Sequence, residues 1–314
     1  SVNESTNQTR IYLPLEVVEP GDLDYPSPDR IGTPQDQKLM LDAFRLSMVN
    51  STTPLRSLQY SRAIPVSYQL VPVVMALEQD PVRMLIADDV GLGKTIEAGL
   101  IVQELRYRGK SKKLLVICPA SLREQWREAL EYFFHIDAKV YSRENRRKLE
   151  RNLPAGTNLL EFHDAFVVSV DYAKAPEVKN LLLDADWDVV IIDEAHQVAK
   201  PHQTNSDHKV DKDRWQLALE ISQSKKIDHL LLLTATPHNG YTDSFASLIH
   251  LLDVNAVSGP LHIPVINQEV ANHHIVQRRR SDVEGWLRSG PSAMSFPTRD
   301  QAEKVIRLSS EELD

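Results

Sequence analysis

The sequence predicts an α/β protein in which helices cover a mainly parallel sheet. The first observation is a series of short apolar runs, rich in valine, isoleucine and leucine, whose lengths suit strands that are buried on both faces. These runs are RMLIA (83–87), KLLVIC (113–118), AFVVSV (165–170), WDVVII (187–192) and HLLLLTA (229–235). The second observation is that longer segments of helical period separate the runs, and such alternation is typical of βαβ units. Together the two observations predict a doubly wound sheet.

Two further segments flank the predicted sheet domain, which is expected over residues 60–255. Residues 1–59 are expected to form an N-terminal extension with a helix over 34–49, where apolar residues recur at helical spacing after a proline. Beyond the sheet the strand–helix alternation stops. Residues 256–314 are therefore expected to be a linker.

The composition is typical of a globular protein. Of the 314 residues, 42% are hydrophobic and 25% are charged. The single cysteine, Cys118, excludes an intrachain disulfide and favours a reducing compartment. No apolar stretch reaches the roughly 20 residues that cross a bilayer, so no membrane partner is expected. The net charge of −8 argues against a uniformly basic nucleic-acid binder, although basic clusters at 106–113, 143–148 and 277–280 allow a local basic surface.

The octamer DDVGLGKT, which follows the first apolar run, matches the phosphate-binding loop G-x-x-x-x-G-K-[ST] except that Asp88 replaces the first glycine. A helical pattern follows at once, which is the context that this loop requires. Gly91 and Gly93 allow a tight turn that aims backbone N–H groups at phosphates. Lys94 would reach the β- and γ-phosphates, and the hydroxyl of Thr95 would ligate Mg²⁺.

The apolar run WDVVII ends on two acids, in the sequence DEAH. Asp193 would hold Mg²⁺ through water, and Glu194 would polarise the attacking water. Two carboxylates at the end of a buried strand are costly without such partners. The loop and the acid pair together predict a site for a nucleoside triphosphate and Mg²⁺.

Six segments, in order along the chain, resemble the motifs of superfamily-two helicase-type ATPases. GLGKT at 91–95, DEAH at 193–196 and LLLLTATPHNG at 230–240 are similar to motifs I, II and III. The pair Tyr68 and Gln69 resembles the glutamine motif that reads adenine. PASLREQW and VVSVDYAK resemble motifs Ia and Ib. The resemblance covers roughly residues 60 to 285 and implies a RecA-like P-loop domain, the first of two ATPase lobes.

Within that superfamily, DDVGLGKT is most similar to the D-E-x-G-L-G-K-T loop of the Swi/Snf-like double-stranded DNA translocases. Asp89 stands where glutamate is usual. KTIEAG resembles the bacterial branch, which includes the ATPase that recycles RNA polymerase and helicase-like proteins of phage-defence islands. VQRRRSDV (276–283) resembles the segment that leads towards the second lobe. We also expect Asp88 or Asp89 to pair with the ammonium of Lys94 in the empty site.

The resemblance implies a role for each matching residue. The residues that would bind ATP are Tyr68, Gln69, Asp89, Gly91, Gly93, Lys94 and Thr95. The residues that would act in hydrolysis are Lys94, Asp193 and Glu194, and the Mg²⁺ ligands would be Thr95 and Asp193. The residues that would contact the DNA backbone or couple it to the nucleotide are Ser121, Ser169, Thr234 and Thr236.

Several of these residues have plainer interpretations. The alternative for Gln69 is a surface position on a helix, and the alternative for Ser121 is a helix cap. Thr234 and Thr236 have the alternative of ordinary hydroxyls at a strand end. The residues interpreted as structural or packing groups are His196, Trp126 and Trp187.

ATPases of this type place ATP between two lobes, and an arginine from the second lobe accelerates hydrolysis by about 10³–10⁵-fold. After residue 283 the sequence shows no second strand–helix series. We therefore expect an N-terminal fragment that binds ATP and Mg²⁺ weakly and hydrolyses ATP barely, if at all, on its own.

The function that the resemblance implies is ATP-driven translocation on double-stranded DNA, with remodelling of protein–DNA complexes in the bacterial cytosol or nucleoid. The implied partners are duplex DNA, the second lobe of the parent chain and proteins of a remodelling or defence complex. The alternatives are an RNA or DNA helicase of the DEAH-box type, a nucleotide-gated interaction module without motor activity, and the motor subunit of a restriction enzyme.

Overall fold

The computed structural model describes residues 55–154, 156–201, 209–237, 242–259 and 263–289. The helix predicted over 34–49 lies outside these residues. The chain divides into two compact units, with a boundary after Gln277. The second unit contributes one described helix, α13 (Arg280–Ser289). All other elements belong to the first unit.

The first unit is built on a seven-stranded sheet of order β3-β4-β2-β5-β6-β1-β9, in which every neighbouring pair is parallel. The strands are β1 Arg83–Ile86, β2 Leu114–Cys118, β3 Ala138–Tyr141, β4 Ala165–Ser169, β5 Trp187–Asp193, β6 Ile227–Leu233 and β9 Ile275–Val276. The predicted apolar runs form β1, β2, β4, β5 and β6. The predicted fold class is therefore confirmed.

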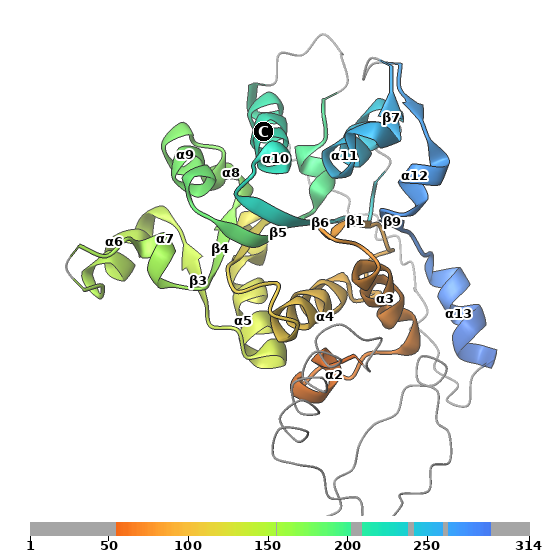
Figure 1. Ribbon diagram of the computed structural model, residues 1–314, viewed down its shortest axis with the longest axis horizontal. Coiled ribbons are helices and arrows are strands. Elements are labelled where there is room, and N and C mark those ends of the chain that lie inside the picture. Colours follow the sequence, from red (N-terminus) through yellow and green to blue (C-terminus); the bar gives the residue numbers. More distant parts are fainter. Residues whose placement is uncertain (1–54, 155, 202–208, 238–241, 260–262, 290–314) are drawn as a thin grey trace, which may run out of the picture. The chain divides into compact units, whose positions relative to one another are not determined.

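Helices cover both faces of the sheet (Figure 1). One face carries α2 (Ser57–Tyr60), α3 (Val71–Leu77), α4 (Lys94–Tyr107) and α5 (Arg123–Phe134). The other carries α8 (Val170–Ala173), α9 (Pro176–Asp184), α10 (Lys209–Gln223) and α11 (Thr242–Leu252). Among the described helices, none combines the length and the apolarity that a membrane span requires.

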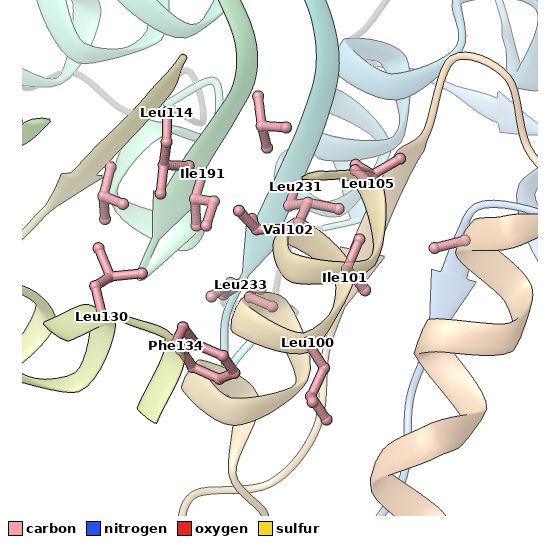
Figure 2. Close-up of a cluster of buried hydrophobic side chains, with 14 of the residues drawn as sticks. Leu100, Ile101, Val102, Leu105, Leu114, Leu130, Phe134, Ile191, Leu231 and Leu233 are labelled. Carbon is pink, nitrogen blue, oxygen red and sulfur yellow. The ribbon is translucent and has the colours of Figure 1, made fainter. Parts of the chain in front are cut away.

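The core is divided into two layers because side chains alternate along each strand. In β1, Met84 and Ile86 belong to the core layer on the side of α3 and α4, whereas Leu85 belongs to the layer on the opposite face, on the side of α11. Figure 2 shows part of the first layer, where Val102 of α4 lies beside Leu231 of β6. Each fully buried aliphatic side chain stabilises the fold by about 1.5–3 kcal/mol. The strand positions that precede the site are thus held from both faces.

Short elements complete the first unit. After β3 come α6 (Arg143–Arg151) and α7 (Leu159–Phe162), and 3-10 turns form at Ser67–Leu70 (η2), Ala120–Leu122 (η3), Ala195–Val198 (η4) and Val254–Ala256 (η5). Residues from 257 to 276, which lie in the expected linker, form β7 (Val257–Ser258), β8 (Val265–Ile266), α12 (Gln268–Asn272) and the edge strand β9. The first unit therefore extends past residue 255.

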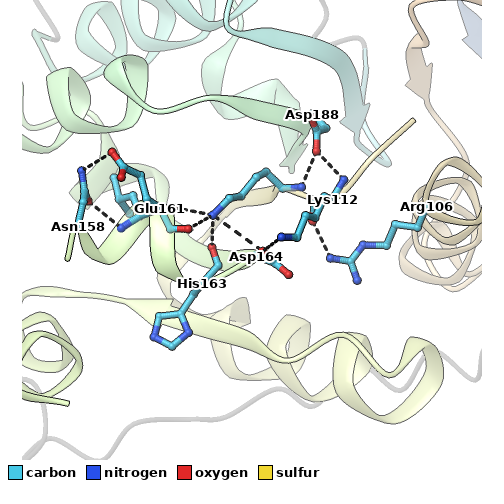
Figure 3. Close-up of polar contacts among 9 residues, drawn as sticks. Arg106, Lys112, Asn158, Glu161, His163, Asp164 and Asp188 are labelled. Atoms are coloured by element: carbon cyan, nitrogen blue, oxygen red, sulfur yellow. Dashed lines mark hydrogen bonds and ion pairs between the residues drawn. The ribbon is translucent and has the colours of Figure 1, made fainter. Parts of the chain in front are cut away.

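The amino edge of the sheet is tied together by the basic cluster at 106–113 (Figure 3). Asp188 at the start of β5 accepts hydrogen bonds from the backbone N–H groups of Lys112 and Lys113. The Lys113 ammonium donates to the carbonyl oxygen of His163 at 2.8 Å, and Arg106 donates to that of Lys112 at 2.7 Å. These cations therefore stabilise the fold at the amino edge of the sheet.

Candidate functional site

The candidate site lies at the carboxyl edge of the sheet, where β5, β6 and β1 are neighbours. Leu233 of β6 is paired with Ile86 of β1 on one side and with Asp193 of β5 on the other. The loop that follows β1, the acid pair that ends β5 and the threonines that follow β6 are therefore brought together. This juxtaposition agrees with the sequence prediction.

The phosphate-type loop makes a left-handed turn into α4. Gly91 has φ of 84° and Gly93, the N-cap of α4, has φ of 95°. A Cβ atom on Gly93 would lie 2.2 Å from Nε2 of Gln69. Glycine is required at this position both by the backbone angle and by the close approach of that amide. The loop leads into the N-terminus of a 14-residue helix, whose free N–H groups favour an anion.

Tyr68 and Gln69 brace this loop from η2. The Tyr68 hydroxyl donates to the carbonyl oxygen of Leu92 at 3.1 Å, and Nε2 of Gln69 donates to the same oxygen at 2.8 Å. The side-chain oxygen of Gln69 accepts from the backbone of Val66. Gln69 is buried, at 8% exposure, so it is not a surface position on a helix. Its contacts place it against the loop.

The ammonium of Lys94 is held at the centre of the site. It donates to the carbonyl oxygen of Asp88 at 2.8 Å and to that of Asp89 at 3.3 Å. The expected partners are therefore the right residues, but the hydrogen bonds go to their main-chain oxygens rather than to their carboxylates. Such neutral acceptors leave the charge of Lys94 available to a phosphate.

Asp193 is fixed by a hydrogen bond to each carboxylate oxygen. Its Oδ2 accepts from the indole Nε1 of Trp126 at 2.8 Å, and its Oδ1 accepts from the backbone N–H of Glu194 at 2.8 Å. Burial raises the pKa of Asp193, while these two hydrogen bonds and the charge of Lys94 oppose that rise. Trp126, which the sequence predicts to be a packing residue, thus also makes a polar contact with the acid pair. A buried indole N–H needs a partner, and that requirement was the available signal.

Glu194 is joined through His196 to the end of β6. Nδ1 of His196 lies 3.2 Å from Oε2 of Glu194, 3.1 Å from the hydroxyl of Thr234 and 3.3 Å from that of Thr236. The hydrogen bond with His196 lowers the pKa of Glu194, and the charge of Lys94 lowers it further. The Thr234 hydroxyl also accepts from the backbone of Thr236 at 3.1 Å. Both threonines thus belong to one network with the acid pair.

The two serines occupy different environments. Ser169 is buried, and its hydroxyl caps α8 by accepting from the backbone of Tyr172 at 3.3 Å. Ser121 is exposed in η3, just past the end of β2, and α5 has Leu122 as its N-cap with no side-chain capping bond. Ser121 is therefore the more accessible of the two at the carboxyl edge.

Comparison with known proteins gives a consistent family. A family model described as "SNF2-related domain" matches residues 68–260. RNA polymerase-associated protein RapA of Serratia proteamaculans is 30% identical over 205 residues, which are 64% of this chain and 20% of that protein. RapA of Stutzerimonas stutzeri is 32% identical over 196 residues, 62% of this chain and 19% of that protein. The chain thus spans about a fifth of the length of these relatives.

Solved structures show the same fold. The SWI2/SNF2 ATPase core of Sulfolobus solfataricus in complex with dsDNA is 20% identical, with a TM-score of 0.55, over 71% of this chain and 46% of that one. The core domain from the same organism is 19% identical, with a TM-score of 0.51, over 73% and 46%. The match to the family model covers the phosphate-type loop, the acid pair and the threonines after β6, and it spans more than half of the chain. This chain therefore belongs to the SNF2-related domain family.

Proposed function

We propose that this chain is the ATP-binding lobe of a DNA-dependent ATPase that translocates on double-stranded DNA and remodels protein–DNA complexes. The observation that carries the proposal is the convergence of Lys94, Asp193 and Glu194 on one edge of the sheet. The charge of Lys94 acts on both carboxylates, because it opposes the rise that burial causes in the pKa of Asp193 and adds to the lowering of the pKa of Glu194 by His196.

ATP and Mg²⁺ suit the groups in this site. The loop with Asp89, Gly91 and Gly93 offers backbone N–H groups to phosphates, and Tyr68 and Gln69 stand beside it for the base. Mg²⁺ usually keeps water and substrate phosphate among its ligands and takes only one or two oxygen atoms from the protein. The hydroxyl of Thr95 and the carboxylate of Asp193 would supply these two oxygen atoms. When bound, Mg²⁺ neutralises charge on the transferred phosphate.

The protein's own groups have distinct tasks in this proposal. Lys94 exchanges its two carbonyl partners for phosphate oxygens, a stronger charge-assisted contact. Glu194 is kept ionised by His196 and so orients and polarises the attacking water. The same histidine contacts Thr234 and Thr236, which makes the end of β6 the route from the nucleotide to DNA.

The proposed partners are duplex DNA, protein, and a second ATPase lobe from the parent chain that supplies an arginine to the transferred phosphate. The relatives support the first two partners, since RapA is an RNA polymerase-associated protein and one Sulfolobus core is in complex with dsDNA. Ser121 is the proposed backbone contact, and Ser169 acts by placing α8. The bacterial RapA relatives support a location in the bacterial cytosol or nucleoid, and the free, buried Cys118 fits such a reducing compartment.

Nucleotide binding tests the site. Titration of this chain with a fluorescent ATP analogue and Mg²⁺ should give saturable binding, and Lys94→Ala should weaken it by about 10- to 100-fold, because a hydrogen bond to a charged group is lost. Lys110→Ala is the control, because Lys110 is ion-paired with Asp80 away from the site. Equal affinity in the wild-type chain and in Lys94→Ala would refute the site.

Nucleic-acid stimulation tests the activity. The parent protein should hydrolyse ATP faster with duplex DNA than with RNA, and this chain alone should turn over little because the arginine of the second lobe is needed. Stronger stimulation by RNA would favour the alternative activity of an RNA-directed helicase. Intact nucleotide binding without any response to nucleic acid would favour the interaction module.

A further inference from the structure

A basic helix, α6, stands apart from the groups used so far. It contains five basic and two acidic residues in the sequence RENRRKLER, within a chain whose net charge is −8. Arg143, Arg147 and Arg151 recur at intervals of four residues and are all exposed. They therefore line one side of the helix, about 6 Å apart, over about 12 Å in total. We call these three residues the arginine stripe.

The arginine stripe faces away from the body of the fold. The inner side of α6 borders a groove of about 380 Å³ shared with α5 and β3, and its contributions to that groove are Asn145, Lys148, Leu149 and Asn152. On a helix, positions 143, 147 and 151 lie on the side opposite to these four. Between them Arg146 pairs with Glu150 at 2.7 Å. Among the described residues, none forms an ion pair with the stripe itself.

The position of α6 in the sheet order makes the stripe relevant to the candidate site. α6 begins directly after β3, at the same carboxyl edge as the site. β3 is followed in the sheet by β4, which ends at Ser169, and by β2, which leads to Ser121. The stripe thus continues the row of strand ends that includes the proposed DNA contact Ser121, on the side away from the nucleotide loop.

We propose that the arginine stripe of α6 is an accessory contact for the phosphate backbone of a nucleic acid. The inference rests on the proposed function, because it takes DNA as the partner of the carboxyl edge. Guanidinium groups bind phosphate with paired N–H donors. The stripe is long enough to face several phosphates, since one strand of duplex DNA carries a charge about every 3.4 Å along its axis.

An acidic protein partner is the competing occupant, and the chemistry of α6 disfavours it. Protein interfaces have an apolar or aromatic centre surrounded by a polar rim. The outer side of α6 presents only charged side chains, from Arg143, Glu144, Arg146, Arg147, Glu150 and Arg151. A surface with more cations than anions and no apolar centre is suited to phosphates, whose binding is driven by release of counterions.

The test is the salt dependence of duplex binding by this chain, measured by fluorescence anisotropy of a labelled DNA duplex. The variant is Arg143→Gln/Arg147→Gln, which removes two charges from exposed side chains. The expected result is a several-fold loss of affinity and a slope of log K against log salt that is smaller by about 1.8, which is 0.9 for each lost contact. Nucleotide binding should be unchanged.

The matched control is Lys110→Gln/Lys112→Gln, which changes the net charge equally but removes lysines that pair with Asp80 and Asp164 at the amino edge. An equal change of slope in both variants would mean a diffuse charge effect and overturn the inference. An unchanged slope in the α6 variant would overturn it as well. If that variant instead loses only its binding to poly-glutamate, the occupant is an acidic protein and the proposal is wrong.

Failure of the proposed function gives a different pattern. In that case the wild-type chain itself shows no salt-dependent binding to duplex DNA. If the wild-type chain binds duplex DNA and both variants match it, the carboxyl edge still binds DNA and only the role of α6 is refuted.

Discussion

The indole Nε1 of Trp126 donates a 2.8 Å hydrogen bond to Oδ2 of Asp193. Trp126 belongs to α5, whereas Asp193 ends β5, so one side chain links the helix after β2 to the carboxylate proposed to bind Mg²⁺. The hydrogen bond fixes the carboxylate and opposes the rise in its pKa that burial causes. Trp126 therefore positions Asp193, the proposed metal ligand, and is not itself a ligand.

Trp126→Phe should lower the affinity of the site for Mg²⁺, while the phenyl ring still fills the buried position. Loss of the indole N–H frees Oδ2 of Asp193, and the loss of such a supporting contact typically costs about 10- to 100-fold in metal affinity. The measurement is a Mg²⁺ titration of nucleotide binding. Trp187→Phe is the control, because Trp187 is equally buried but donates to the carbonyl of Leu182 in the other core layer. Equal Mg²⁺ affinities in the two variants would contradict the role.

Gly93→Ala should abolish nucleotide binding. The new Cβ meets Nε2 of Gln69 at 2.2 Å, and φ of 95° is strained for alanine. Gly109→Ala is the control, because Gly109 has φ of 70° with open space around it, so the variant should lose only about 1–2 kcal/mol of stability and keep binding. Adding Gln69→Ala to Gly93→Ala should restore part of the free energy of unfolding, measured in urea. No restoration would show that the clash is relieved elsewhere.

His196→Ala should change how stability depends on pH. His196 lowers the pKa of Glu194, so the contribution of this contact is complete at neutral pH and is lost as the pH falls through the folded-state pKa. The variant should therefore lose stability at neutral pH and show a shallower loss on acidification. Urea unfolding from neutral to acidic pH measures both. Parallel curves for the variant and the wild-type chain would rule out the linkage.

Cys118 should be unreactive in the folded chain. It is buried in β2, and burial raises the pKa of its thiol to about 12. The thiolate, which is the reactive form, is therefore scarce at neutral pH. Mass spectrometry after alkylation should show modification only in denaturant. Rapid alkylation of the native chain would mean that β2 opens readily.

The sheet was predictable because its central strands are buried on both faces and so appear as continuous apolar runs, as in LLVIC of β2. The edge strands were not. β3 has the sequence AKVY, with a partly exposed lysine, and β9 contains two residues, so neither produces such a run. Both are too short or too mixed in composition to be separated from loops by their apolar pattern.

The sequence indicated which residues lie at the site, but it did not indicate which atoms they contact there. Spacing and strand ends indicated Lys94 and Asp193, because parallel strands bring their carboxyl ends to one edge. Nothing in the spacing shows that Lys94 contacts carbonyl oxygens, because that contact depends on how the loop folds back on itself. Nor does it show that Trp126 reaches Asp193, since that bond joins residues 67 positions apart and depends on how α5 packs. Their roles in binding stay predictions.

The carbonyl oxygen of Leu92 has two donors, the hydroxyl of Tyr68 and the amide of Gln69. Either donor alone satisfies a buried acceptor, so the arrangement is redundant. In the proposed contact with a base, the Gln69 amide would leave this oxygen, which would stay paired with the Tyr68 hydroxyl. The proposed recognition of a base would thus not expose the Leu92 oxygen to the cost of desolvation.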